Sequence, residues 1–522
     1  MRRSYLFILI ATAVSAAIND PVKLDTGMIS GVAGNNPEVR VYKGIPFAAP
    51  PIGDLRWRAP QAPPKWEGTR KADQFGPMCM QGGAGAGRGP AKGPAKGPAK
   101  GNAPASAMSE DCLYLNVWTA GKPGEKRPVM LWIYGGGYNT GSGSQPDYDG
   151  EALAKKGAVV VTINYRLGVF GFFSYPELTR ESDRRGAGNF GLLDSIAALQ
   201  WVQKNIAAFG GDPKRVTIFG ESAGAGLVAN LMVSPQAKGL FHRAIGESSS
   251  WTTATIGRLN TLTEAEQAGM KYADGLGARS LAELRAKPAD QILKAGRGVG
   301  PIVDGWSIPE DPGIVFAQGK QNDVPVLVGS NRDESFGATP GNAAQYAEQS
   351  RKRYGDLADS FMKVYPGASD EQAKDSAFFA GRDEMAFVMR NWARMEAKTG
   401  KSKAYVFFFT HQPPVQPNAK GGKFGPGPHG SAVHTSELPY VFNHLRGPRA
   451  WTDVDRQVAD TMSSYWVNFA ATGDPNGKGL PKWLPYDDSR NKSAMEFGDK
   501  AGMGPPPDEA KLAVFQAFYD KL

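Results

Sequence analysis

The stretch that decides the fold is residues 189–225, NFGLLDSIAALQWVQKNIAAFGGDPKRVTIFGESAGA. Its first part, residues 191–209, has the pattern of a helix, and RVTIFGES at 215–222 is a continuous apolar run typical of a buried strand. Ser222 therefore stands between two glycines where a strand gives way to a helix. This is the pattern of a nucleophile elbow, in which a tight turn holds the serine oxygen clear of the backbone. A plain surface turn could carry the same motif.

Strand-like and helix-like segments alternate along most of the chain. Apolar runs predict further strands at 128–137, 158–166, 243–249, 324–331 and 403–411. Because these runs are continuous rather than alternating, they favour buried strands of a parallel sheet. The sequence therefore predicts an α/β fold with a large, mostly parallel central sheet flanked by helices. Helix-like segments at 254–300 and 340–400 would form a cap or a side subdomain.

The composition excludes several classes of function. The net charge is +9 over 522 residues, but two of the basic residues lie at the extreme N-terminus and four lie in one repetitive tract. The remainder is only weakly basic, which argues against a nucleic-acid-binding protein. Two cysteines and five scattered histidines have no metal-ligand spacing. We expect neither a metal nor a cofactor.

The N-terminus, MRRSYLFILIATAVSAAIND, has the pattern of a secretory signal peptide. Arg2 and Arg3 precede an apolar run that is too short to span a bilayer, and small residues follow it. We expect cleavage of residues 1–17 and export of a single domain, residues 18–522, to the periplasm or the extracellular space. A buried N-terminal strand is the alternative. No other run approaches membrane length, so no stable membrane insertion is expected.

Cys79 and Cys112 are the two cysteines of the chain. In an exported protein an even pair favours a disulfide, although two free buried thiols are also possible. Between them the unit Gly-Pro-Ala-Lys occurs three times, and its proline and glycine content opposes helix and sheet. We predict a flexible loop at about 82–107. It is either a tolerated insertion or a segment that anchors the protein to an acidic surface.

A serine nucleophile needs hydrogen-bond donors for the oxyanion that forms on attack. WIYGGGYNTGSG supplies a candidate, since three glycines follow an apolar strand directly and allow adjacent N–H groups to face one point. An ordinary glycine loop is the alternative.

Several separate segments together resemble the type-B carboxylesterase and cholinesterase family of α/β-hydrolases. They are YKGIPFAAPPIGDLRWRAPQ at 42–61, SEDCLYLNVW at 109–118, the stretch at 189–225, GSNRDES at 329–335 and HTSELPYVF at 434–442. The resemblance covers the chain from about residue 22 to its C-terminus. It implies an α/β-hydrolase fold with helical insertions.

The resemblance also implies the site residues. A catalytic triad would consist of Ser222, Glu334 and His434, in the chain order expected for this fold. The oxyanion hole would consist of the N–H groups of Gly136, Gly137 and Ala223. Arg56 and Glu110 match a structural ion pair near the disulfide. Asp194 and Asp304 lie in family-like contexts and are interpreted as structural.

Each triad position has a rival in the sequence. Asp333 neighbours Glu334 and could be the acid instead. His429 lies in a Gly/Pro-rich segment that would orient an imidazole poorly, and His411 is interpreted as an anchor at a strand end.

One departure from the cholinesterases concerns specificity. Their disulfide loop carries a tryptophan that stacks on the choline cation, whereas residues 80–111 contain no aromatic residue. The sequence therefore predicts a general carboxylesterase that acts on a small-molecule ester. A lactonase, an amidase or a thioesterase using the same triad, and a catalytically silent binding protein, are the alternatives. The oligomeric state is not indicated.

Overall fold

The computed structural model describes residues 20–82, 108–184, 186–251, 258–336, 339–415 and 429–521. The predicted signal peptide at 1–17 and nearly all of the predicted loop at 82–107 lie outside the described residues. Among the described helices, none combines the length and the apolar content that crossing a membrane requires.

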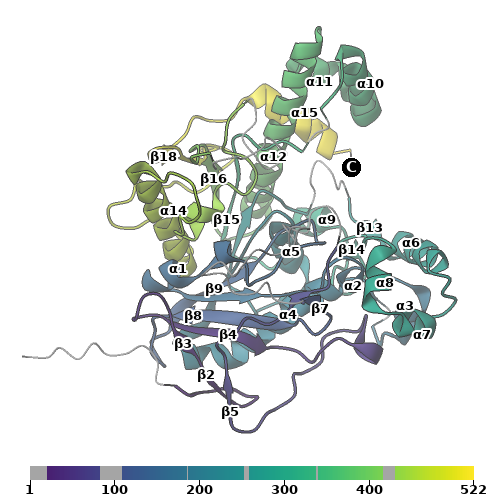
Figure 1. Ribbon diagram of the computed structural model, residues 1–522. Helices are drawn as coiled ribbons and strands as arrows, with labels where there is room; N and C mark the ends of the chain where they lie inside the picture. The colour runs from purple at the N-terminus through teal and green to yellow at the C-terminus, as the bar shows by residue number, and fades with distance from the viewer. Residues whose placement is uncertain are drawn as a thin grey trace, which may run out of the picture.

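A large mixed sheet forms the centre of the protein (Figure 1). Its described strands run in the order β18-β17-β16-β15-β12-β11-β9-β10-β8-β4-β3. Their bounds are β3 Val32–Ala33, β4 Arg40–Pro46, β8 Tyr114–Thr119, β9 Arg127–Ile133, β10 Val159–Ile163, β11 Gly211–Glu221, β12 Arg243–Glu247, β15 Val326–Asn331, β16 Ala404–Phe409, β17 Met495–Phe497 and β18 Ala501–Met503. Smaller sheets pair β1 Val22–Lys23, β2 Met28–Ser30 and β5 Thr69–Lys71, then β6 Met78–Cys79 with β7 Met108–Ser109, and β13 Asn260–Thr261 with β14 Ile302–Val303.

Every neighbouring pair from β10 through β9, β11, β12, β15 and β16 to β17 is parallel. The prediction of a mostly parallel sheet is confirmed for this central run, which contains all six predicted strands. The edges are different, because β8, β4 and β3 on one side and β18 on the other pair antiparallel. The sequence reading did not anticipate these edge strands, several of which are only two or three residues long.

Helices connect and cover the strands. Their bounds are α1 Glu151–Lys155, α2 Gly168–Gly171, α3 Pro176–Glu181, α4 Phe190–Asn205, α5 Ala223–Val233, α6 Leu262–Gly275, α7 Leu281–Ala286, α8 Ala289–Lys294, α9 Pro312–Ala317, α10 Ala343–Tyr354, α11 Ala358–Val364, α12 Asp370–Thr399, α13 Leu438–Val441, α14 Asp453–Thr472 and α15 Glu509–Tyr519. Short 3-10 turns are η1 Gly53–Leu55, η2 Pro146–Tyr148, η3 Ile206–Phe209, η4 Pro235–Ala237 and η5 Gly355–Leu357.

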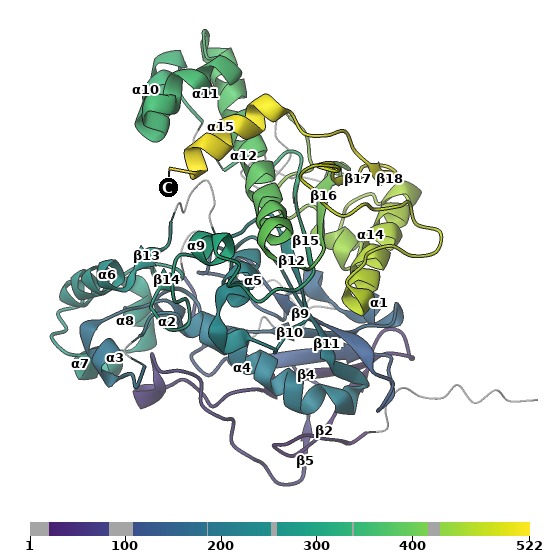
Figure 2. The ribbon, with the colours of Figure 1, turned by 180° about the vertical axis from the view of Figure 1, so that it is seen from behind.

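Two adjacent residues of β12 show that helices cover both faces of the sheet. A Cβ on Gly246 would lie 2.4 Å from the ring of Trp392 in α12. The next residue, Glu247, accepts a hydrogen bond from the indole of Trp466 in α14. Because successive residues of a strand point to opposite faces, α12 and α14 pack on opposite sides. In Figure 2, α4, α5 and α12 lie in front of the sheet.

The two helix-rich segments contain helices, as predicted, but the second one also packs on the central sheet. The segment 254–300 contains α6, α7 and α8. The segment 340–400 contains α10, α11 and α12, and together with α15 these helices enclose a second apolar core at the top of Figure 1. Helix α12 also lies along the central sheet, so it joins this core to the main one.

Asp194 and Asp304 have structural roles, as the sequence predicts. The Asp194 carboxylate is fully buried near the start of α4 and accepts hydrogen bonds from Arg166 N, Nε and Nη2 at 2.7–2.9 Å. Asp304 accepts from Ser307 Oγ and from two backbone N–H groups of its own turn. The ion pair between Arg166 and Asp194 ties the segment after β10 to helix α4.

We expect Asp194→Ala to lower the free energy of unfolding by about 3–5 kcal/mol, since it leaves the buried guanidinium of Arg166 without its counter-ion. Lys294→Ala is the control, because Lys294 is 79% exposed and pairs with Asp290 only at the surface. Its effect should stay below about 1 kcal/mol. Urea denaturation followed by circular dichroism measures both. Equal losses in the two variants would contradict the role of the buried pair.

Candidate functional site

Ser222 lies at the turn between β11 and α5 in a left-handed backbone conformation. Its φ is 55° and its ψ is −129°, which is unusual for a residue other than glycine. The turn is tight because a Cβ on Gly220 would lie 2.6 Å, and one on Gly224 only 2.0 Å, from the carbonyl oxygen of Ile133 in β9. The two glycines of the motif are therefore required by a close approach of two backbones. The N–H of Ser222 donates to the carbonyl of Glu247 at 2.8 Å.

Two further predicted site residues lie against each other at the same edge of the sheet. Glu334 follows the end of β15, and His434 precedes α13. The carboxylate of Glu334 is 2.8 Å from Nδ1 of His434, and its other oxygen accepts from the N–H of Asn331 at 2.9 Å. Strands β11 and β15 are in one parallel sheet, so their carboxyl ends bring Ser222 and Glu334 to a common edge.

The imidazole of His434 is held between two carboxylates. Its Nε2 is 3.0 Å from an oxygen of Glu221, the residue that directly precedes Ser222. The ring is buried, and the ring of Phe336 packs edge-on against it at 4.7 Å between centroids. The contact with Glu221 brings the imidazole to the turn that carries the serine.

Burial by itself would lower the pKa of His434. The negative charge of Glu221, with the hydrogen bonds and charge that Glu334 adds, outweighs burial and holds the pKa well above its ordinary value. The direction of this shift follows from the two carboxylates that contact the ring, one at each nitrogen.

Sequence reasoning missed three buried glutamates at this site, one that contacts the ring and two that interact electrostatically with that glutamate. They are Glu221, Glu247 and Glu437. Glu437 accepts a hydrogen bond from the side-chain amide of Asn331. Burial raises the pKa of Glu247 to about 8, and the charge of Glu221 adds to this effect, whereas the hydrogen bond from Trp466 opposes it. Two of them were visible in the motifs, because Glu221 lies inside GESAG and Glu437 lies three residues after His434.

The rivals of the triad residues are engaged in other interactions. The carboxylate of Asp333 pairs with Arg332 at 2.9 Å and accepts from the N–H of Ala432. His411 lies between Asp499 and Asp455, at 2.7 and 2.9 Å, just after the end of β16. His429 lies against the ring of Phe378 and 3.5 Å from Asp375.

The glycine loop after β9 packs directly on the serine turn. A Cβ on Gly135 would lie 2.8 Å from Cβ of Ser222 and 2.7 Å from the carbonyl oxygen of Glu221. Gly136 and Gly137 follow with φ of 106° and 62°, in the region that favours glycine. Ala223 is the first residue of α5, whose early N–H groups have no partner within the helix. The three predicted oxyanion donors thus come from two segments in contact.

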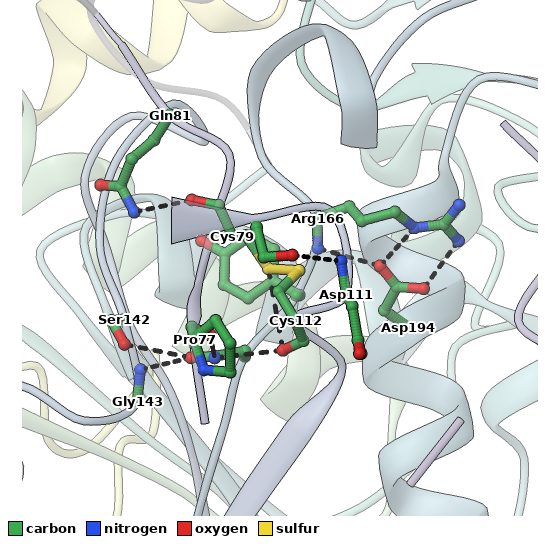
Figure 3. The surroundings of a disulfide bond; sticks show 12 residues. Pro77, Cys79, Gln81, Asp111, Cys112, Ser142, Gly143, Arg166 and Asp194 are labelled. Carbon is green, nitrogen blue, oxygen red and sulfur yellow. Dashed lines mark hydrogen bonds and ion pairs between the residues drawn. A yellow bond between two sulfur atoms is a disulfide. The ribbon is translucent and has the colours of Figure 1, made fainter. Parts of the chain in front are cut away.

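Cys79 and Cys112 form the predicted disulfide, which is confirmed (Figure 3). Close by, Arg56 donates through Nε and Nη2 to both oxygens of Glu110, each at 2.6 Å. The third nitrogen of Arg56 donates to the carbonyl of Lys287 at 2.7 Å, which ties this region to the turn between α7 and α8. No group of three or more acidic, cysteine or histidine side chains within the described ranges is placed to hold a metal ion.

Comparison with known proteins gives one consistent result. The model of the carboxylesterase family matches residues 19–515. The fumonisin B1 esterase of Sphingopyxis macrogoltabida is 37% identical, over 96% of this chain and 91% of its own. The para-nitrobenzyl esterase of Bacillus subtilis is 31% identical, over 94% of this chain and 97% of its own. Among solved structures, a carboxylesterase of Geobacillus stearothermophilus has a TM-score of 0.79 at 32% identity and covers 95% of this chain and 100% of its own.

We expect Glu221→Gln to lower the pKa of His434, because removal of the adjacent negative charge destabilises the imidazolium. The histidine NMR titration of protein labelled at its five histidines measures this value, with His434→Ala for assignment. Asp333→Asn removes a charge that does not contact His434 and is the control. A pKa that stays the same or rises in Glu221→Gln would contradict the geometry.

Proposed function

The chain belongs to the carboxylesterase family and is a carboxylic ester hydrolase, and from this premise we propose that it acts through an acyl-enzyme on Ser222. The observation that carries the proposal is that the imidazole of His434, bound to Glu334, contacts Glu221, the residue directly before Ser222 in the strained elbow. Both features serve a single chemical purpose, which is the removal of a proton from a hydroxyl that attacks a carbonyl.

In the proposed mechanism His434, once its Nε2 has lost its proton, takes the proton of the Ser222 hydroxyl as the oxygen attacks the ester carbonyl. The carbonyl oxygen becomes an oxyanion, which accepts hydrogen bonds from the N–H groups of Gly136, Gly137 and Ala223. The C–O bond to the alcohol breaks, and the imidazolium returns its proton to the leaving alkoxide. A water then attacks the acyl-enzyme with His434 as base, which releases the acid and restores Ser222.

The two carboxylates have different parts in this proposal. Glu334 accepts from Nδ1 and so fixes the tautomer and the orientation of the ring. Glu221 lies on the Nε2 side and stabilises the imidazolium that forms when the serine is deprotonated. The charge of Glu221 and the bond and charge of Glu334 together raise the pKa of His434.

The substrate is proposed only as a class. The relatives named above hydrolyse chemically different esters according to their names, so likeness to them selects no single ester. Residues 80–111 lack the aromatic platform for a quaternary ammonium, and a general carboxylesterase is therefore favoured over a choline esterase. We also propose export, supported by the N-terminal segment and by the disulfide, which is typical of oxidising compartments.

We expect Ser222→Ala to abolish labelling by a fluorophosphonate probe and to lower kcat for para-nitrophenyl acetate about 10⁴- to 10⁶-fold. Ser248→Ala is a matched control. Ser248 is a buried serine with φ of 58° after the neighbouring strand β12, and its N–H also donates to a backbone carbonyl at 2.8 Å. The Ser248→Ala variant should still be labelled at Ser222. Folded wild-type protein that resists the probe would contradict an activated serine and favour a binding protein.

We expect Gly136→Ala to lower kcat at least 100-fold, since the new Cβ would lie 2.1 Å from the carbonyl oxygen of Thr140 and would displace an oxyanion donor. Gly239→Ala is the control because Gly239 also has a positive φ, 78°, but has no atom within 4 Å of the new Cβ. Steady-state kinetics on para-nitrophenyl acetate separate the two. Equal activity in both variants would contradict the assignment of Gly136 to the oxyanion hole.

A further inference from the structure

One side chain of the disulfide-bonded segment holds the glycine loop. Gln81 follows Cys79 by two residues, and its amide exchanges two hydrogen bonds with Gly141, as a strand partner would. The N–H of Gly141 donates to Oε1, and Nε2 donates to the carbonyl of Gly141, both at 2.9 Å. The same Nε2 also donates to the carbonyl of Cys79 at 3.1 Å, as Figure 3 shows. Gln81 is buried, so water does not easily replace these bonds.

The hydrogen-bonded end of the loop is in direct contact with the predicted oxyanion donors. Thr140 precedes Gly141, and its N–H donates to the carbonyl of Gly136 at 3.1 Å. The backbones approach so closely that a Cβ on Gly136 would lie 2.1 Å from the carbonyl oxygen of Thr140. Gly141 itself is pressed on the ring of Tyr134, where a Cβ would lie at 2.3 Å. A displacement of Gly141 would therefore move Thr140, which contacts Gly136 directly.

Other hydrogen bonds hold the residues on either side of Gly141. The hydroxyl of Ser142 donates to Asn164, and the hydroxyl of Thr140 donates to the carbonyl of Gly136. Gly143 is held to β10 and the residue that follows it, because its N–H donates to Asn164 and its carbonyl accepts from Thr162. Tyr138 accepts from the N–H of Gly168 at the far side of the loop. Among the described side chains, Gln81 alone bonds to both backbone groups of Gly141.

We propose that Gln81 is a positioning residue for the oxyanion hole, and that the Cys79–Cys112 disulfide fixes the segment from which it acts. This inference rests on the proposed function, since it assigns a role to Gln81 through Gly136 and Gly137. Loss of the amide leaves both backbone groups of Gly141 buried without a partner, and the loop relaxes to satisfy them. The oxyanion donors then move away from the position at which charge develops in the transition state.

The test is Gln81→Met, which keeps the length and the burial of the side chain but removes its hydrogen bonds. We expect kcat for para-nitrophenyl acetate to fall about 10- to 100-fold, less than for complete loss of an oxyanion donor. KM should change less than threefold, because the defect affects mainly the transition state. Inhibition by an aryl trifluoromethyl ketone, which forms an oxyanion on the serine, should weaken by a factor similar to the fall in kcat.

Gln321→Met is the matched control. Gln321 is as buried as Gln81, at 7% exposed, and bonds to Glu396 and Thr399 rather than to the loop. It should lower the melting temperature as much as Gln81→Met does, with kcat unchanged. A folded Gln81→Met variant whose kcat and ketone affinity match those of Gln321→Met would overturn the proposal. If Gln81→Met yields no folded protein, Gln81→Glu, which keeps the acceptor for the Gly141 N–H, takes its place under the same criterion.

A double-mutant cycle tests the role of the disulfide. Cys79→Ala with Cys112→Ala should lower kcat, and the addition of Gln81→Met should then cost less than threefold more, because both changes release the same segment. If the two changes lower kcat by factors that simply multiply, the proposed role of the disulfide is wrong. Failure of the proposed function is distinguishable, since Ser222 would then remain unlabelled by the fluorophosphonate in wild-type protein, whereas Gln81→Met should still be labelled, only more slowly.

Discussion

The site depends on one close approach of two backbones, where the carbonyl of Ile133 at the end of β9 lies against Gly220 and Gly224. The contact leaves no room for a Cβ at either glycine, so the chain turns sharply after β11 and Ser222 takes a left-handed conformation. The same end of β9 leads into the glycine loop, which packs on the serine turn. Parallel pairing of β9 with β11 thus aligns both segments before any side chain takes part.

Electrostatics is the second constraint. Glu221 and Glu334 contact the imidazole of His434, and the buried Glu247 and Glu437 each interact with Glu221. A buried carboxylate is costly unless a counter-charge or a proton neutralises it. Burial raises the pKa of Glu247 to about 8, and burial together with the charge of Glu221 raises the pKa of Glu437. Burial therefore disfavours the charged form of these two glutamates.

The segments outside the sheet are where specificity can differ within the family. Helices α6–α8 and α10–α12 extend the molecule at two places, and the second group has a core of its own. Relatives that share between 30 and 40% of their residues with this chain carry the names of different esterases. Side chains of loops and helices outside the sheet can vary without disturbing it, so we expect differences among these relatives there.

The sequence by itself predicted the α/β class and six of the seven strands in the central parallel run, because continuous apolar runs are local patterns. It favoured the disulfide without deciding it, since an even pair of cysteines can also remain as free thiols. It also indicated Ser222 through the elbow motif, and Glu334 and His434 through resemblance to the family. Only the tertiary structure decided that Glu221 faces Nε2 of His434 and that Gln81 holds Gly141. These partners are 213 and 60 residues apart, and no periodicity links them. Glu221 ends a strand of the large sheet, at the edge where segments distant in the chain become neighbours. Gln81 lies outside that sheet, in the segment that the Cys79–Cys112 disulfide holds.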